Sequence, residues 1–443
     1  MQFRKLLFRK VRKPVGAFIS GALLLITAVL TGLVIQSQAQ PPNSEMRARQ
    51  ILRSAPDLNI NLPGSGGTPL PRGSFGPGNG NFAPQPVPHG SLTAHFEYIL
   101  VEGTIYVYDI DNSFHLVKQI NIPQAKAVRG MAASPATHTL YISYGGDGGS
   151  VGNGSMLAYD LLSNTVKWTM SYPFGIDSMA VTPDGTTLYM PTGESSPGSA
   201  WEVIDAATGK PLGSIDAGES PHNTVVSLDG RRVYMGPRNG DYLVVADTGT
   251  NSVIRRIGPL IGGVRPFTIN GSQTLAFTTA THFLGFQVSD INTGQVLFTV
   301  PVAGFNVSAD YVPSAPSHGI SLSPDEREIW VMDGANGYVH VFDVSGLPNS
   351  LPKQVADLRL SRPMSGVETP CVYDCAHDGW VQHSRDGRYV FIGDSGDVFD
   401  ATTRQPATNL DPLYNTRTFL EIDWQNGLPD STTTREGLGY IVR

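Results

Sequence analysis

Ionisable side chains recur at one offset along this chain and could together bind a metal ion or an anion. Six similar turns begin at Pro135, Pro183, Leu228, Ile269, Pro324 and Arg385. The positions seven residues before the second residue of each turn are Arg129, Asp177, His222, Gly263, His318 and Gly379. Four of these six are ionisable, although only 16% of the chain is charged. Imidazole and carboxylate groups are ligands for zinc, copper, manganese and iron, whereas imidazolium and guanidinium attract anions.

His377 and Asp378 lie within two residues of the Gly379 position and are further candidates for the same site. A metal held there with an open coordination position could activate water or polarise a carbonyl. The plainer alternative is that these side chains are polar because they face water, or because they tie neighbouring repeats together. The helical spacings His-x3-His and His-Glu-x2-His are absent, so both interpretations stay open.

The only two cysteines, Cys371 and Cys375, have three residues between them, and no second pair completes a four-ligand zinc site. In an exported chain we expect them to form a disulfide. Haem attachment is excluded, because His377 does not complete a Cys-x2-Cys-His motif. A pyrroloquinoline quinone propeller would repeat a tryptophan after each repeat's Asp turn, and only Trp168 does so.

The elements that must position these residues repeat too. A Pro-Asp-Gly-like turn precedes a β-branched and aromatic run, as in Pro183-Asp-Gly-Thr-Thr-Leu-Tyr-Met. Each of these turn-and-strand units is followed by an apolar run that ends in Asp and leads into a polar turn. These residues are spaced by 42 to 57 positions and are Asp109, Asp160, Asp205, Asp247, Asp290, Asp343 and Asp400. Four short strands per period of this length predict an all-β fold, a seven-bladed β-propeller.

The repeat count predicts how the ring closes. Asp109 has no Pro-Asp-Gly-like turn upstream, so the first blade lacks its leading strand. A surplus β-like segment, 418–424, follows the seventh Asp turn. We therefore expect this segment to pair with the strands around Glu97 to Asp109, closing the ring through the N- and C-terminal strands. Equivalent inner strands would then bring the recurring ionisable positions to one channel.

Three phrases resemble the YVTN-type β-propeller repeat family of exported bacterial proteins. They are Val181-Thr-Pro-Asp-Gly-Thr-Thr-Leu-Tyr, Val203-Ile-Asp-Ala-Ala-Thr-Gly-Lys and Ser321-Leu-Ser-Pro-Asp-Glu-Arg-Glu-Ile-Trp-Val. The resemblance covers nearly all of residues 95–425. It implies the propeller fold but supplies no catalytic residues, because such propellers include binding proteins, lactonases and cofactor enzymes.

The N-terminus predicts export. Residues 1–13 carry six basic side chains, and Gly16 to Ile35 is an almost wholly apolar run of twenty residues. Ser37 and Ala39 are small residues at signal-peptidase spacing. Residues 1–39 are thus a signal peptide cleaved after Ala39 or a retained membrane anchor. Residues 40–92 are a Pro/Gly-rich flexible linker and 93–443 the propeller.

Without the six N-terminal basic residues the chain keeps 25 basic against 38 acidic side chains. An acidic body without a basic stripe is not expected to bind nucleic acid, and it meets a membrane only through an uncleaved N-terminus. The favoured function is an exported scaffold, in the periplasm, at the cell surface or outside the cell, that binds a small-molecule ligand or protein partner. The alternative is a metal-dependent enzyme, a lactonase-type hydrolase or an oxidoreductase, using the channel-rim histidines.

Overall fold

A computed structural model describes residues 93–434 except 312. The predicted N-terminal segment 1–39 and linker 40–92 lie outside the described residues. The chain divides into two compact units, Met1–Asn81 and Phe82–Arg443, and all described residues belong to the second. Within them no helix is both long and apolar enough to span a bilayer.

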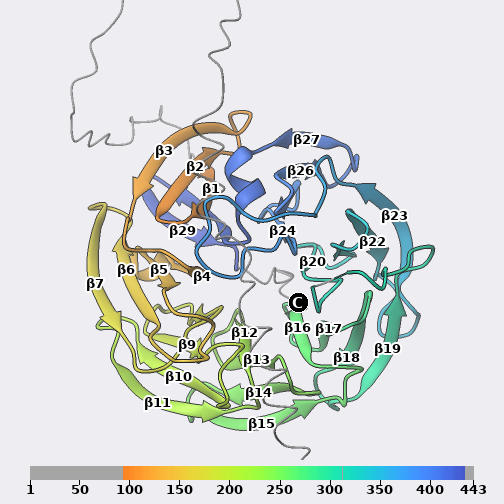
Figure 1. Ribbon diagram of the computed structural model, residues 1–443, viewed down its shortest axis with the longest axis horizontal. Coiled ribbons are helices and arrows are strands. Elements are labelled where there is room, and N and C mark those ends of the chain that lie inside the picture. The colour runs from red at the N-terminus through yellow and green to blue at the C-terminus, as the bar shows by residue number, and fades with distance from the viewer. Residues whose placement is uncertain (1–92, 312, 435–443) are drawn as a thin grey trace, which may run out of the picture. The chain divides into compact units, whose positions relative to one another are not determined.

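Seven antiparallel sheets surround a central channel, one sheet per repeat (Figure 1). We number the sheets as blades 1 to 7 in ring order, and in blades 2 to 7 the strands run in sequence from the channel outward. Blade 2 contains β4 (Val128–Ser134), β5 (Thr139–Tyr144), β6 (Ser155–Asp160) and β7 (Thr165–Ser171). Blade 3 contains β8 (Ala180–Val181), β9 (Thr187–Pro191), β10 (Ala200–Asp205) and β11 (Pro211–Asp216). Blade 4 contains β12 (Pro221–Val226), β13 (Arg232–Pro237), β14 (Leu243–Asp247) and β15 (Ser252–Ile257).

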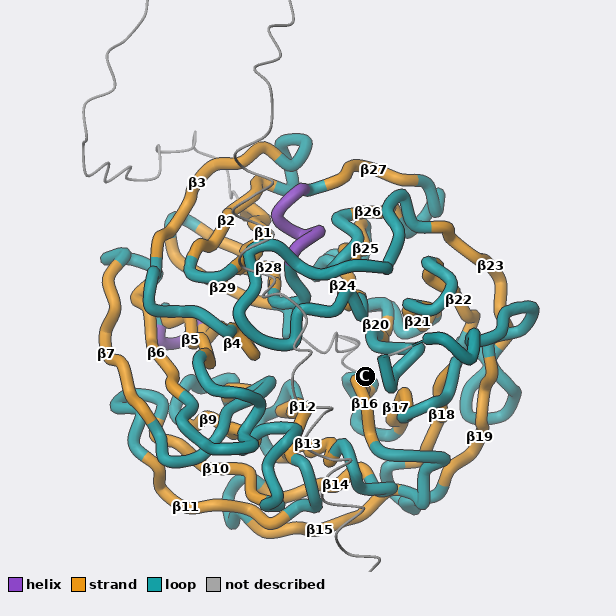
Figure 2. The backbone as a smooth tube through the Cα atoms, in the orientation of Figure 1, coloured by secondary structure: helices purple, strands orange, loops and turns teal. Residues whose placement is uncertain are grey.

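The remaining blades follow the same order. Blade 5 contains β16 (Val264–Ile269), β17 (Leu275–Ala280), β18 (Gly285–Asp290) and β19 (Val296–Pro301). Blade 6 contains β20 (Ile320–Leu322), β21 (Glu328–Asp333), β22 (Tyr338–Asp343) and β23 (Lys353–Arg359). Blade 7 contains β24 (Trp380–His383), β25 (Tyr389–Gly393), β26 (Asp397–Asp400) and β27 (Pro406–Asn409). Two short 3-10 turns, η1 (Pro135–Thr137) and η2 (Asp411–Asn415), are the helical elements of the described residues (Figure 2).

Blade 1 confirms the predicted ring closure. Its sheet has the order β29-β28-β1-β2-β3, formed by β1 (Thr93–Val101), β2 (Thr104–Asp109), β3 (His115–Asn121), β28 (Phe419–Gln425) and β29 (Leu428–Thr432). β28 from the C-terminal end pairs antiparallel with β1, in a register that places Ile99 opposite Phe419. Trp424 Nε1 adds a hydrogen bond of 3.2 Å to the Tyr98 hydroxyl. β29 is a fifth strand that the repeat count did not predict.

Local chemistry explains why each repeat folds alike. The Asp that ends the third strand accepts amide hydrogens from its own turn, as Asp205 Oδ1 does from Thr208 at 2.8 Å. Apolar residues of neighbouring blades then pack face to face; Tyr141 of blade 2 and Leu188 of blade 3 share one cluster. Outer strands such as β15 are largely exposed, whereas inner strands such as β12 are buried throughout. The rigid inner strands therefore set the positions of the side chains that line the channel.

Candidate functional site

Equivalent backbone hydrogen bonds show which residues of each blade face the channel. The amide of Met332 bonds the carbonyl of Gly319 in blade 6, and the amide of Leu100 bonds that of Thr418 in blade 1. Arg417 therefore matches His318. The repeat offset missed Arg417, because its strand is followed by no Pro-Asp-Gly-like turn.

Blade 5 corrects one position of the predicted set. The amide of Asn270 bonds the carbonyl five residues on, as the amide of Ser227 does in blade 4. The Asn270 side chain also accepts the hydrogen bonds that stabilise this turn. Asn270 therefore corresponds to Ser227 of blade 4 and not to Asp229. His222 lies five residues before Ser227, and the residue five before Asn270 is Arg265 rather than Gly263. The prediction was wrong by two residues, because Asn-Gly here resembles the Asp-Gly of other turns.

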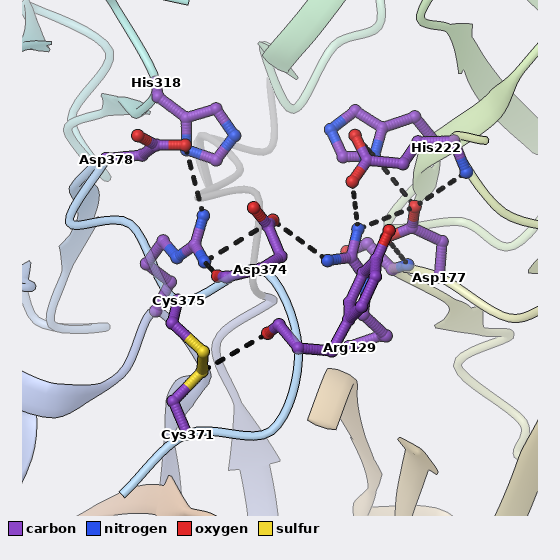
Figure 3. A network of polar contacts seen from close by, with 12 residues as sticks. Arg129, Asp177, His222, His318, Cys371, Asp374, Cys375 and Asp378 are labelled. Atoms are coloured by element: carbon purple, nitrogen blue, oxygen red, sulfur yellow. Dashed lines mark hydrogen bonds and ion pairs between the residues drawn. A yellow bond between two sulfur atoms is a disulfide. The ribbon is translucent and has the colours of Figure 1, made fainter. Parts of the chain in front are cut away.

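Arg129 is the centre of a buried ion-pair network on the blade 2–3 side of the channel (Figure 3). Its guanidinium lies 3.2 Å from Asp177, 2.8 Å from Glu194 and 3.1 Å from Asp374. Burial raises the pKa of Glu194, but Arg129 and the other positive groups nearby, Arg238 among them, together outweigh burial and lower this pKa to about 2. Glu194 follows β9 and was not among the predicted residues.

His222 and His318 face each other across the channel (Figure 3), with ring centres 6.4 Å apart. His222 Nδ1 lies 3.0 Å from Asp177 Oδ2, and His318 Nδ1 lies 3.2 Å from the carbonyl of Gly379. Because a carboxylate and a carbonyl only accept, both Nδ1 atoms carry the proton of these hydrogen bonds. Burial, with help from nearby Arg417, lowers the pKa of His318 well below its usual range, so this ring is neutral.

Arg417 is a second centre, on the opposite side. It forms ion pairs with the carboxylates of Glu368, Asp374, Asp378 and Asp394. Asp374 therefore bridges Arg417 and Arg129 (Figure 3). It lies within the loop that the Cys371–Cys375 disulfide closes, with an S–S distance of 1.97 Å. The disulfide loop thus places a carboxylate between two channel arginines.

The last two predicted residues lie at the blade 7 side. Asp378 Oδ2 is 3.5 Å from Arg417, while its Oδ1 is buried and has no hydrogen-bond partner within residues 93–434. Burial raises the pKa of Asp378 to about 7, against the opposing effect of Arg417. His377 is buried against Tyr414, with ring centres 4.7 Å apart, and neither of its ring nitrogens finds a partner in the described part of the chain.

A cleft of about 1010 Å³ opens beside the channel, between the segment before β20 and the segment before β24. Arg238, Arg265, Tyr311 and His318 line it. Arg265 is only 3% exposed, yet its closest carboxylate, on Glu194, lies 3.9 Å away and is bound more tightly by Arg238. Burial and the neighbouring Arg238 lower the pKa of Arg265 to about 10, which still leaves it charged at neutral pH.

The channel therefore offers buried guanidinium donors and two imidazole rings, but not a complete set of metal ligands. Within the described residues, one group of three or more His, Cys, Asp or Glu side chains has ligand atoms all within 4.8 Å, and it lies in blade 1. Asp177 Oδ2 already accepts from both Arg129 and His222. Its role is to orient His222 rather than to supply a free ligand.

No protein-family model and no curated protein matches the chain. A solved structure, a chain of the hydrazine synthase of Kuenenia stuttgartiensis, is similar at 18% identity with a TM-score of 0.48. The similarity covers 71% of this chain and 91% of that one. The seven sheets of this chain, rather than this similarity, establish its architecture.

Proposed function

We propose that this propeller is an exported binding protein whose ligand is a small anionic molecule received in the cleft beside the channel. The observation that supports this is Arg265, a buried cation on the cleft wall with no carboxylate closer than 3.9 Å among the described residues. Burying a charge is costly unless a partner compensates it. An anionic group of a ligand, placed against Arg265 and Arg238, would supply that partner.

Two further groups indicate what else the ligand carries. Tyr311 lines the cleft, and its hydroxyl is buried without a hydrogen-bond partner in the described residues. His318 lines the same cleft and presents a lone pair at Nε2. A ligand with a carboxylate or phosphate beside a hydroxyl group would satisfy the guanidinium, the imidazole and the phenol together. Hydroxycarboxylates and sugar phosphates have this chemistry.

Calorimetry with lactate, gluconate, glucose 6-phosphate and inorganic phosphate tests the proposal. We expect Arg265→Gln to weaken binding of the preferred anion by at least about tenfold, the equivalent of about 1.4 kcal/mol. Arg256→Gln, on the exposed outer strand β15, removes the same charge far from the cleft and should bind normally. Equal affinities in the two variants, or no binding of any of these anions, would refute the proposal.

The second candidate is a metal-dependent enzyme, a lactonase-type hydrolase or an oxidoreductase, and the facing Nε2 atoms of His222 and His318 favour it. His222 Nε2 is buried without a hydrogen-bond partner among residues 93–434. Two neutral imidazoles could bind zinc, copper or manganese, with water or substrate completing the coordination. Calorimetry with these ions should then show binding that His222→Ala abolishes, and that weakens as protons compete at low pH.

We also infer membership of the YVTN-type repeat family, which the three sequence phrases support. A repeat scaffold of that kind presents loops around one rigid ring, and such loops make a recognition surface for a ligand or partner.

A further inference from the structure

A second cluster of ionisable side chains lies where the ring closes, on the paired strands β1 and β28. In the β1–β28 ladder His95 is directly opposite Asp423, and Glu97 is directly opposite Glu421. Directly opposed residues share a face of a sheet, and so do residues two apart on one strand. The four side chains therefore form a two-by-two array on one face of blade 1.

The carboxylates of this array are buried and incompletely bonded. Glu97 and Glu421 are each 1% exposed, and Asp423 is 4% exposed. Glu97 Oε1, Glu421 Oε1 and Asp423 Oδ1 have no hydrogen-bond partner in the described part of the chain. One ligand atom each from His95, Glu421 and Asp423 lies within 4.8 Å of the other two. Unsatisfied buried oxygens are rare in native proteins and call for a missing partner.

The rest of the array is held in place. Asp111 bonds His95 Nδ1 at 3.0 Å, the amide of Arg385 bonds Glu421 Oε2 at 2.6 Å, and Ser431 donates to Asp423 Oδ2 at 2.8 Å. His95, Glu421 and Asp423 thus each have one atom fixed by the protein. Support of this kind from surrounding groups is typical of metal ligands.

Negative charges would gather on this face of blade 1 if its carboxyl groups ionised. Two glutamates directly opposite each other repel when ionised. Burial, followed by the nearby Asp423, raises the pKa of both Glu97 and Glu421 well above the usual range. Arg385 Nε lies 3.8 Å from Asp423 Oδ2. A divalent cation bound between these side chains would offset the repulsion among their carboxylates.

We propose that His95, Glu421 and Asp423, with Glu97 beside them on the same face, form a divalent-cation site of mixed nitrogen and oxygen ligation, suited to Zn²⁺ or Mn²⁺. Carboxylates favour Mn²⁺, and the imidazole favours transition ions over Ca²⁺ or Mg²⁺. One ligand comes from the first strand of the propeller and two come from the C-terminal strand that pairs with it. The ion therefore links the two ends of the ring and stabilises its closure.

The test uses the full chain, stripped with a chelator and then titrated with ZnCl2, MnCl2 or CaCl2 by calorimetry. We expect one ion per chain, with Zn²⁺ or Mn²⁺ bound more tightly than Ca²⁺. At a metal concentration about one hundred times the Kd, the melting midpoint should rise by about 4 °C. Absence of binding by all three ions, or tighter binding of Ca²⁺, would overturn the proposal.

Variants assign the ion to this site. The double variant Glu97→Gln/Glu421→Gln keeps the shape of the protonated side chains, so it should fold, and a melt without metal checks this. It should lose metal binding and the metal-dependent rise in melting midpoint. Glu219→Gln, at an exposed position, should behave as the wild type. His222→Ala should also keep this binding, since it alters only the channel. Loss of the ion in His222→Ala, or its retention in the double Gln variant, would place it elsewhere.

Discussion

At the residue scale, the channel is built from buried charges that compensate one another. Arg129 and Arg417 each contact several carboxylates, and Asp374 is shared between them. Removing one partner of such a network leaves another charge buried and incompletely paired. One carboxylate oxygen of Asp378 is buried and has no hydrogen-bond partner in the described residues. Its ionisation therefore costs stability.

The raised pKa of Asp378, about 7, predicts how stability depends on pH. Between its ordinary pKa near 3.8 and about 7 the folded state holds a proton that the unfolded state has lost, so this group's contribution falls as pH rises. Asp378→Asn, which resembles the protonated form, should match the wild type near pH 4. At pH 8 it should be more stable by at most about 4 kcal/mol.

Urea unfolding at both pH values measures this difference. Asp310→Asn removes a charge from an exposed position on the same cleft and serves as the control. A constant difference between Asp378→Asn and the wild type across this pH range would show that Asp378 is ionised throughout.

At the element scale, the loop of the Cys371–Cys375 disulfide and the closing strand matter most. The loop holds Asp374 between Arg129 and Arg417, in the way that an anionic ligand would lie there. The closing strand β28 lies between β29 and β1 in the sheet of blade 1. The disulfide loop positions Asp374 in the site, and β28 closes the ring.

Replacing both cysteines by serine should cost little global stability, because the disulfide closes a loop of only a few residues. We expect a loss of no more than about 2 kcal/mol in urea unfolding. The freed loop should let Asp374 leave the arginines, so an anion that binds the wild type should bind the variant more tightly. Thiol titration of the unfolded, unreduced wild type should find no free thiols; two would contradict the disulfide.

Ending the chain after Arg417 removes β28 and β29 and leaves β1 without its inner partner. The exposed strand edges should cause aggregation or loss of cooperative melting. A chain ending at Thr434 keeps both strands and controls for the missing length. If the shorter chain melts like the control, closure by β28 is not needed for stability.

At the scale of the whole molecule, we propose that the chain is exported, because a basic and then apolar segment precedes the propeller in the sequence. Mass spectrometry of the exported protein should find a mature N-terminus at or near Gln40. An intact chain beginning at Met1 and recovered from the membrane fraction would instead establish a retained anchor.

The sequence by itself determined the seven repeats, the all-β architecture and the closure by 418–424, because turn chemistry and strand alternation are local patterns repeated along the chain. It also brought Arg129, Asp177, His222 and His318 together, since a ring converts one repeat offset into spatial proximity. These four positions could be found without any structure.

Only the tertiary structure decided which other side chains complete the site. Glu194, Arg238 and Asp374 lie outside the repeat offset, so no periodic signal marks them. Arg265 was missed because Asn270 plays a different part in its turn from the one that the sequence suggested. The pairing of Glu97 with Glu421 depends on the register between the two ends of the chain, which is set by long-range packing and not by either segment alone.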